Sequence, residues 1–310
     1  MYTEKEIWEI LSEVEDPEIP VLTVIDMGII RSVSIEGDLT TVVISPTYSG
    51  CPAMKTIETD IAEILGRVRQ QMAAGLKVIK FCPTDALAHI DTPTELKNIV
   101  SRVEAVRNEV GDDIGIALDF HGRFSLAMAR KVFPLLEEFN LLFIEEPVLP
   151  EFSDKFDLIV ASTSTPIATG ERLLHREQFL PLLEDGLIDV AQPDVCHAGG
   201  VTELRKISAL CDTYGVTMAP HNPLGPIATM VNVHLGLTTP NFLIQEVMRS
   251  DVSWRSEVFS GVPEIKDGHI YPPTAPGIGV EMDEKEAAKH PFVSGTPVQW
   301  FHNDGSVADW

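Results

Sequence analysis

Three apolar stretches in the middle of the chain each end in an acidic residue: residues 114–119 read IGIALD, residues 141–145 read LLFIE and residues 166–171 read PIATGE. The acids are Asp119, Glu145 and Glu171, so successive acids are 26 residues apart (145 − 119 and 171 − 145). An interval of this length accommodates one short strand and one helix. Regular alternation of strands and helices is typical of a parallel sheet with crossover helices.

The same alternation extends on both sides of these stretches. Apolar segments predict seven strands, at residues 77–81, 114–120, 141–145, 166–170, 188–192, 216–220 and 242–246. Segments between them predict helices, among them residues 94–110, 125–139, 175–185 and 200–214. We therefore expect the α/β class and an incomplete (β/α)8 TIM-type barrel, one strand short of eight.

The first 65 residues follow a different pattern. Residues 4–14 predict a helix, residues 16–20 (DPEIP) a loop, and residues 28–35 and 40–46 a pair of strands joined at Glu36-Gly37-Asp38. Helix resumes after Pro52 and continues to Ala74 without a linker. We expect a small truncated α+β domain at residues 1–65, joined within this helix to a barrel at residues 66–310.

Composition limits the classes of partner and the cellular location that we expect. The chain has 47 acidic and 23 basic residues, a formal net charge of −24, which argues against nucleic acid or an anionic membrane as a partner. The N-terminus has no signal-peptide pattern, and no stretch reaches the length of a membrane span. The four cysteines form no C-x-x-C pair and fit no zinc site, so we expect a reducing, cytoplasmic location.

The three acids predict a metal site. The ends of successive barrel strands lie side by side on the catalytic face, so Asp119, Glu145 and Glu171 would converge there. Three carboxylates held together repel each other unless a cation is present, and an all-oxygen ligand set favours Mg²⁺. A single strand-end acid is more often a surface residue or a helix cap; the equal register of all three favours the metal.

Two histidines also follow predicted strands. His121 lies two residues after Asp119, and in an extended chain these positions point the same way. His221 ends the strand at 216–220, next to Asp194, which could bond its imidazole and raise its basicity. Glu246 ends the strand at 242–246. A lone strand-end histidine is usually structural, but here two flank a predicted cation.

These groups suit a dehydration. A metal that binds a substrate carboxylate stabilises the enediolate formed when the α-proton leaves. His221 would be the base, and His121 would protonate the departing β-hydroxyl. Base-plus-Mg²⁺ chemistry of this kind is known from the enolase superfamily.

Several motifs resemble the galactonate dehydratase branch of that superfamily, in its mandelate racemase-like subgroup. They are DFHGR at 119–123, FIEEP at 143–147, GER at 170–172, QPD at 192–194, HAGG at 197–200, APHNPLGPI at 219–227 and GIGVE at 277–281. The likeness implies an Mg²⁺-dependent hydro-lyase that converts an aldonate such as D-galactonate to a 2-keto-3-deoxy acid. It also implies a small sugar acid as the substrate and a homo-oligomer as the assembly.

The resemblance assigns roles by position. It implies Asp119, Glu145 and Glu171 as Mg²⁺ ligands, His221 with Asp194 as the base and His121 as the acid; Glu246, Lys80 and Arg172 would contact the substrate. The family commonly has Asn two residues after the lysine, where this chain has Cys82. The family's N-terminal cap and first barrel strand have no counterpart here, so we expect poor turnover.

Residues 1–65 resemble a second family, the PaaD-like proteins linked to iron–sulfur assembly. The matching motifs are DPEIP at 16–20, DMGII at 26–30 and TYSGCP at 47–52, in which Cys51 matches the family's characteristic cysteine. Cys51 precedes a helix, whose N-terminal dipole can lower a thiol pKa. It is equally well explained as a small residue in a tight turn.

Two alternatives to the dehydratase remain open at this point. The chain could be an iron–sulfur or oxygenase accessory module fused to an inactive barrel, a hypothesis that rests on Cys51 and the 16–30 motifs. Racemisation by His121 together with Cys82 is the other, and the DFHGR context makes it the weaker.

Overall fold

The computed structural model describes residues 3, 8, 30–36, 39–44, 52–84, 87–248 and 252–291. The chain divides into two compact units, Met1–Ala62 and Glu63–Trp310. Cys51, the loop at 16–20 and most of the predicted helix at 4–14 lie outside the described residues, although Trp8 is helical.

The first unit contains the predicted pair of strands. Strand β1 (Ile30–Glu36) pairs antiparallel with β2 (Leu39–Ile44), with Glu36 opposite Leu39 and an irregularity between Ile30 and Ser32. Val33 is buried while its neighbours Ser32 and Ser34 are exposed, the alternation expected of a strand with one covered face. Helix α2 (Pro52–Ala73) then starts where the sequence predicts it, and the boundary between the two units falls within this helix.

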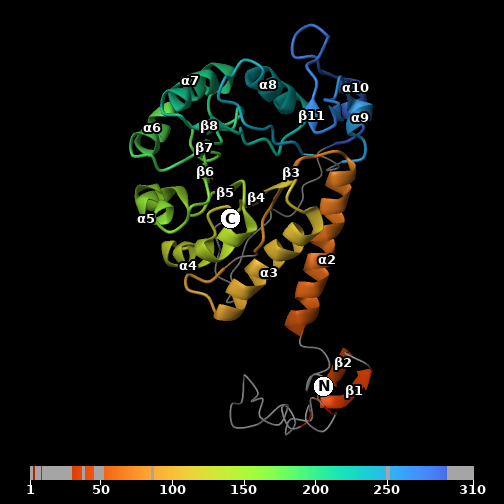
Figure 1. Ribbon diagram of the computed structural model, residues 1–310. Helices are drawn as coiled ribbons and strands as arrows, with labels where there is room; N and C mark the ends of the chain where they lie inside the picture. Colours follow the sequence, from red (N-terminus) through yellow and green to blue (C-terminus); the bar gives the residue numbers. More distant parts are fainter. Residues whose placement is uncertain are drawn as a thin grey trace. The chain divides into compact units, whose positions relative to one another are not determined.

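Six parallel strands form the sheet of the second unit. They are β3 (Val78–Phe81), β4 (Gly115–Asp119), β5 (Phe143–Glu145), β6 (Ile167–Thr169), β7 (Val190–Ala191) and β8 (Thr217–Met218). Each strand pairs with the next one in the sequence, and Figure 1 shows them following one another around a curved sheet. The sheet is therefore part of a barrel, and six of the seven predicted strands are confirmed.

The seventh predicted strand, at residues 242–246, is wrong in extent. It pairs with β8 only through a bridge between Met218 and Phe242, extended by the Leu243 N–H that donates to the Met218 carbonyl. Beyond this point side chains replace the strand ladder, because the Glu246 carbonyl accepts from the Asn222 amide and from the Gln245 amide.

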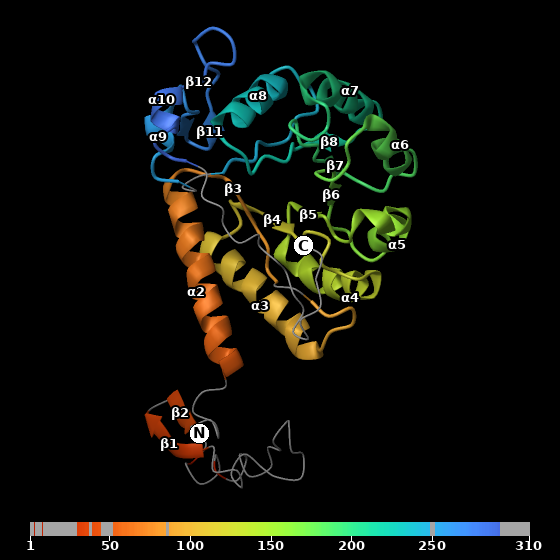
Figure 2. The same ribbon diagram turned by 180° about the vertical axis from the view of Figure 1, so that it is seen from behind.

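Helices lie on the outer side of the sheet (Figures 1 and 2). They are α3 (Pro93–Val110), α4 (Leu126–Leu136) with the 3-10 turn η1 (Glu137–Phe139), η2 (Pro150–Lys155), α5 (Phe156–Val160), α6 (Arg176–Glu184) and α7 (Gly200–Thr213). Polar caps explain two of the starts: the Thr92 and Ser125 side chains accept from the backbone N–H groups of Glu95 and Met128. The sequence places α3, α4 with η1, α6 and α7 within one or two residues, as is usual for helix ends.

The C-terminal part adds short elements to this frame. Helix α8 (Pro226–Gly236) is followed by α9 (Arg255–Val258) and α10 (Glu284–Ala287). Strand β9 (Phe259–Ser260) pairs with β12 (Glu281–Met282), and β10 (Ile265–Lys266) pairs with β11 (His269–Ile270). Val280 packs against α8 through Met230 and Val233, which attaches this segment to the barrel.

Alternation along the strands separates two cores. Ile116 and Leu118 of β4 join the large core between sheet and helices, whereas Ala117 joins a smaller cluster inside the barrel with Phe143 of β5 and Ala168 of β6. Since side chains two residues apart share a face, Asp119 and Glu145 continue the inner rows of Ala117 and Phe143 at the C-terminal ends of their strands.

No helix in the described ranges is both long and apolar enough to cross a lipid bilayer.

Shortening a buried side chain of the outer core should destabilise the fold. Phe133 of α4 is fully buried, with its ring centroid 5.7 Å from that of Phe120 and 5.6 Å from that of Phe124. We expect Phe133→Ala to lower the free energy of unfolding by about 3–5 kcal/mol, measured by urea denaturation. Leu135 on the same helix is 45% exposed, so Leu135→Ala should cost less than about 0.5 kcal/mol. Equal losses in the two variants would contradict this packing.

Candidate active site

Three buried carboxylates meet at the C-terminal ends of β4, β5 and β6. Asp119 and Glu145 are direct register partners across the β4–β5 pair, and Glu171 follows β6 by two residues. One carboxylate oxygen of each lies within 4.8 Å of the others. The exposed fractions of Asp119, Glu145 and Glu171 are 5%, 0% and 8%. The register of the sheet therefore gathers like charges where little water can screen them.

Lys80 on β3 supplies the nearest positive charge. Its ammonium lies 2.8 Å from Glu145 Oε1, 3.3 Å from Asp119 Oδ2 and 2.7 Å from Glu246 Oε1. Burial works against the charged form, but Glu145, Asp119 and Glu246 together hold the pKa of Lys80 well above its usual value. A positive charge is thus built into the acidic cluster.

The acids carry more negative charge than Lys80 neutralises. Burial raises the pKa of Glu145 well above its ordinary value, and the nearby Asp119 and Glu246 charges add to the rise against the opposing pull of Lys80. Burial likewise raises the pKa of Glu171, with Asp119 adding to the rise and His221 opposing it. A divalent cation among these oxygens would remove the repulsion that favours protonation.

The oxygen atoms of the cluster fit a hard cation. Within the described residues, Glu145 Oε2 is buried without a hydrogen-bond donor. Buried carboxylate oxygens normally have a partner, and leaving one without is costly. Three carboxylates and no sulfur ligand are the donor set that Mg²⁺ prefers. Asp119, Glu145 and Glu171 are therefore a suitable ligand set for such an ion.

His221 lies beside this cluster on the loop that follows β8. Its Nδ1 is 2.8 Å from Asp194 Oδ2, and its Nε2 is 3.1 Å from Glu171 Oε2. Asp194 is fully buried and also accepts from the Cys196 N–H at 2.6 Å, so its carboxylate is fixed in place. A carboxylate on Nδ1 orients the ring so that Nε2 is the atom facing the acids.

The charges around this pair favour proton transfer at His221. Burial disfavours the imidazolium, but the hydrogen bond that the ring donates to Asp194 and the charge of Glu171 outweigh it and raise the pKa of His221. Burial would raise the pKa of Asp194, but the bonds from His221 and Cys196 lower it overall. The dyad thus combines a carboxylate that stays ionised with a more basic imidazole.

His121 reaches the cluster by a different route from the one that the sequence predicts. Strand β4 ends at Asp119, and His121 and Gly122 both have left-handed backbone, with φ of 51° and 73°. The extended-chain argument is therefore wrong at this residue. The turn instead brings His121 Nε2 to 3.2 Å from Asp119 Oδ2, and the His121 N–H donates to Asp119 Oδ1 at 3.0 Å.

The turn is fixed by the neighbouring strand and by Arg172. The Gly122 N–H donates to the Glu146 carbonyl at 2.7 Å, and the Arg172 guanidinium donates to the His121 carbonyl at 3.0 Å. Burial lowers the pKa of His121; Asp119 opposes this, whereas Arg123, Lys80 and Arg172 reinforce it. The two imidazoles therefore contact different acids of the cluster, and their pKa values shift in opposite directions.

Glu246 and Arg172, predicted to contact substrate, already have protein partners. Glu246 Oε2 accepts from the Asn222 N–H at 2.7 Å, and Glu246 Oε1 pairs with Lys80. The Arg172 Nε lies 3.8 Å from Glu171 Oε1 and 3.9 Å from Glu146 Oε2. Both side chains border the cluster, so the structure brings together all nine predicted residues of the barrel site.

Cys82 is engaged beside the site. Its thiol donates to the Thr84 carbonyl, and its sulfur lies 3.1 Å from the Arg123 guanidinium. Arg123 in turn donates to the same Thr84 carbonyl. These bonds tie Cys82 to the loop after β3 and offer no support for the racemase hypothesis, in which the thiol would carry a proton.

Sequence reasoning missed Glu146 and Asn222. Glu146 is 1% exposed and accepts from the Thr169 hydroxyl and the Gly170 N–H. Burial raises the pKa of Glu146 to about 7, although the bond from Thr169 opposes the rise. Asn222 is fully buried and donates to Thr229 and to the Glu246 carbonyl. An acid and an amide directly next to predicted site residues were the available signals.

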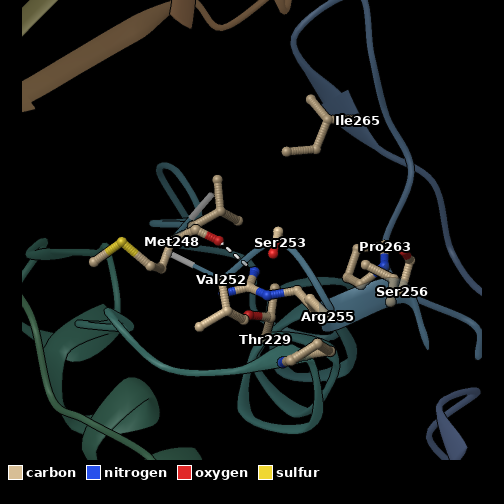
Figure 3. A pocket seen from close by; sticks show the side chains of 11 residues that line it. Thr229, Met248, Val252, Ser253, Arg255, Ser256, Pro263 and Ile265 are labelled. Atoms are coloured by element: carbon tan, nitrogen blue, oxygen red, sulfur yellow. Dashed lines mark hydrogen bonds between the residues drawn. The ribbon is translucent and has the colours of Figure 1, made fainter. Parts of the chain in front are cut away.

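A cavity of about 610 Å³ opens between β3 and the segment 242–248. Lys80 and Glu246 line it, together with inner barrel residues Ala117, Phe143 and Ala219. A second cavity of about 570 Å³ lies at the start of α8 (Figure 3), where the Arg255 guanidinium donates to the Met248 carbonyl at 2.6 Å. Of these two cavities, the first is lined by Lys80 and Glu246, which border the acidic cluster.

Another group of candidate ligand atoms lies on the C-terminal elements. Glu257, Glu286 and His290 place one atom each within 4.8 Å of the others. Glu257 is exposed, and Glu286 is already paired with the Lys289 ammonium at 2.6 Å. This group lacks the burial that distinguishes the triad.

Comparison with known proteins fixes the family. Residues 63–286 match the family model for the enolase C-terminal domain-like proteins. The chain belongs to this family. Residues 4–74 match a second model, iron–sulfur cluster assembly protein, so both resemblances seen in the sequence are confirmed.

Relatives of the enolase-like part include two curated proteins named D-galactonate dehydratase. That of Ralstonia pickettii (strain 12J) is 38% identical over 258 residues, and that of Cronobacter sakazakii (strain ATCC BAA-894) is 37% identical over 257 residues. Each match covers 80% of this chain and 67% of the relative.

Solved structures of the same family agree with the fold. A mandelate racemase/muconate lactonizing enzyme-like protein from Rubrobacter xylanophilus has a TM-score of 0.71 at 32% identity, covering 75% of this chain and 61% of that one. An enolase from Pantoea ananatis, solved with D-gluconate and Mg, has a TM-score of 0.69 at 29% identity, covering 80% and 68%. The chain thus spans about two thirds of the length of these relatives.

The Asp194–His221 contact makes a testable prediction. Asp194→Asn removes the negative charge that favours the imidazolium, so we expect the pKa of His221 to fall, as measured by NMR titration of the ring in EDTA-treated protein. Asp112→Asn removes an exposed acid and should leave the His221 titration unchanged. An unaltered His221 curve in Asp194→Asn would show that the carboxylate does not tune the ring.

Proposed function

We propose that this protein is a Mg²⁺-dependent hydro-lyase that dehydrates a sugar acid, an aldonate such as D-galactonate, to a 2-keto-3-deoxy acid. The observation that carries the proposal is the meeting of three buried carboxylates and two imidazoles, each imidazole within 3.2 Å of one of the acids. The names of the curated relatives and the D-gluconate and Mg in the Pantoea ananatis structure support the same substrate class.

Asp119, Glu145 and Glu171 would hold the Mg²⁺ ion. When bound, the ion supplies positive charge that stabilises the additional negative charge of a substrate carboxylate when its α-proton is removed. Lys80 contributes a second, permanent positive charge that contacts two of the same acids. The pocket can thereby accept an anionic substrate although the chain as a whole carries a formal charge of −24.

His221 is the proposed base. Its Nε2 is the ring atom that faces the cluster, since Nδ1 is bonded to Asp194. Nε2 takes the proton from the carbon next to the substrate carboxylate and leaves an enediolate. The Asp194 carboxylate stabilises the imidazolium that results, as a carboxylate does for other catalytic histidines.

His121 is the proposed acid, on the side of the cluster formed by Asp119. It gives a proton to the β-hydroxyl as the carbon–oxygen bond breaks, which releases water and an enol that becomes the 2-keto acid. The lowered pKa of His121 disfavours the protonated form before substrate binds. The negative charge of an aldonate beside the ring favours the protonated form that this step requires.

The reaction can be tested with a semicarbazide assay for 2-keto acid across a panel of aldonates, with Mg²⁺ and with EDTA. We expect product only with Mg²⁺. His221→Asn and His121→Asn should each lower kcat by about 100-fold or more, since general acid or base catalysis contributes 10²–10⁴. Glu104→Gln changes an exposed acid and should leave kcat unchanged.

Two results would argue against the proposal. Absence of 2-keto acid from every aldonate at high enzyme concentration would remove the reaction, and full activity in EDTA would remove the metal. The expected order of effects is also specific: Asp194→Asn should reduce kcat through His221 while Mg²⁺ binding, measured by calorimetry, persists, because Asp194 is not in the ligand set.

A second candidate function concerns the N-terminal part of the chain. The match of residues 4–74 to the iron–sulfur cluster assembly model favours a role as an accessory module for an iron–sulfur scaffold or oxygenase. In that case the full chain should co-purify with such a partner, and Cys51→Ser should reduce the yield whereas Cys196→Ser should not. Equal recovery with Cys51→Ser would remove the thiol from this role.

A further inference from the structure

We propose that Glu146 is a positioning residue that holds Glu171 in the ligand set. This inference rests on the proposed function, because it assigns a task to the metal centre. Glu146 directly follows the ligand Glu145, yet its side chain contacts other groups. Its backbone is left-handed, with φ of 43°, a conformation that is uncommon for residues other than glycine. The turn allows Glu145 to face the cluster while Glu146 contacts the end of β6.

The Glu146 carboxylate contacts the residues on both sides of Glu171. Its Oε1 accepts from the Thr169 hydroxyl and from the Gly170 N–H, the latter at 3.1 Å. Its Oε2 lies 3.9 Å from the Arg172 Nε. Glu171 stands between Gly170 and Arg172 in the sequence, so one buried carboxylate contacts both of its neighbours.

The backbone of Glu146 joins the same three strand ends. Its N–H donates to the Ala168 carbonyl on β6 at 3.1 Å, and its carbonyl accepts from the Gly122 N–H after β4 at 2.7 Å. The turn that carries Glu171 is closely packed, because a Cβ on Gly170 would lie 2.8 Å from the Gln192 backbone. Outer groups of this kind commonly orient metal ligands, and their loss costs metal affinity.

The donors around Glu146 predict how each substitution acts. Both partners of Oε1 are donors, so the side-chain oxygen of Glu146→Gln can still accept from them. Glu146→Ala removes the acceptor entirely, and Thr169→Val removes one donor without changing charge. We expect Mg²⁺ affinity to fall by about 10–100-fold in Glu146→Ala, less in Thr169→Val and least in Glu146→Gln. Glu138 is exposed, so Glu138→Ala is the control for loss of one acid.

Two measurements on the full chain test the proposal. Calorimetric titration with Mg²⁺ gives the affinity series. NMR chemical shifts of the His221 ring, which lies 3.1 Å from Glu171, give a metal-free reading of Glu171 position. We expect His221 shifts to change in Glu146→Ala and Thr169→Val and to stay at wild-type values in Glu138→Ala.

The outcomes separate the two proposals. Unchanged His221 shifts and unchanged Mg²⁺ affinity in folded Glu146→Ala would overturn the positioning role alone, even if the variant unfolds at a lower temperature. If Glu146→Ala does not fold, wild-type affinity and shifts in Thr169→Val overturn it. Changed His221 shifts in a chain that binds no Mg²⁺ would instead support the positioning of Glu171 and contradict the metal-dependent function.

Discussion

The arrangement of the site depends on the pairing of β4 with β5. It places Asp119 opposite Glu145 at the last register position of the two strands, inside a barrel whose inner residues are otherwise Ala117, Phe143 and similar apolar groups. Two adjacent acids in such surroundings cost free energy unless opposite charge accompanies them. Lys80 supplies part of that charge, and the remaining excess is what makes a divalent cation a fitting addition.

The two imidazoles acquire different properties from the same cluster. The Nδ1 side of the His221 ring is bonded to the buried carboxylate of Asp194. His121 instead has Asp119 beside it and also lies near the guanidinium groups of Arg123 and Arg172. The first environment favours a proton acceptor, and the second favours release of a proton. Groups whose surroundings separate their pKa values are suited to opposite roles in acid–base chemistry.

The sequence predicts the strand order and the acids well because both depend on local patterns. An apolar run that ends in an acid marks the C-terminal end of a parallel strand. Asp119, Glu145 and Glu171 repeat this pattern every 26 residues, which places the three acids at the same end of the sheet. Glu146 and the turn at His121 escape this reasoning. Their positions depend on left-handed backbone and on hydrogen bonds to residues distant in sequence, such as Thr169 and Arg172. The segment at 242–246 was overestimated for the same reason, since side chains of Asn222 and Gln245 replace its ladder.

Lys80 also links the two sides of the open part of the barrel. It belongs to β3, and its partner Glu246 belongs to the segment that follows the bridge to β8; their side chains meet at 2.7 Å beside the cavity of about 610 Å³. Glu246 is in turn anchored to the loop of His221 through the Asn222 N–H. A chain of polar contacts therefore runs from β3 through Lys80 and Glu246 to the proposed base. Since the same Lys80 contacts Asp119 and Glu145, the arrangement of the acids and that of His221 depend on one ammonium group.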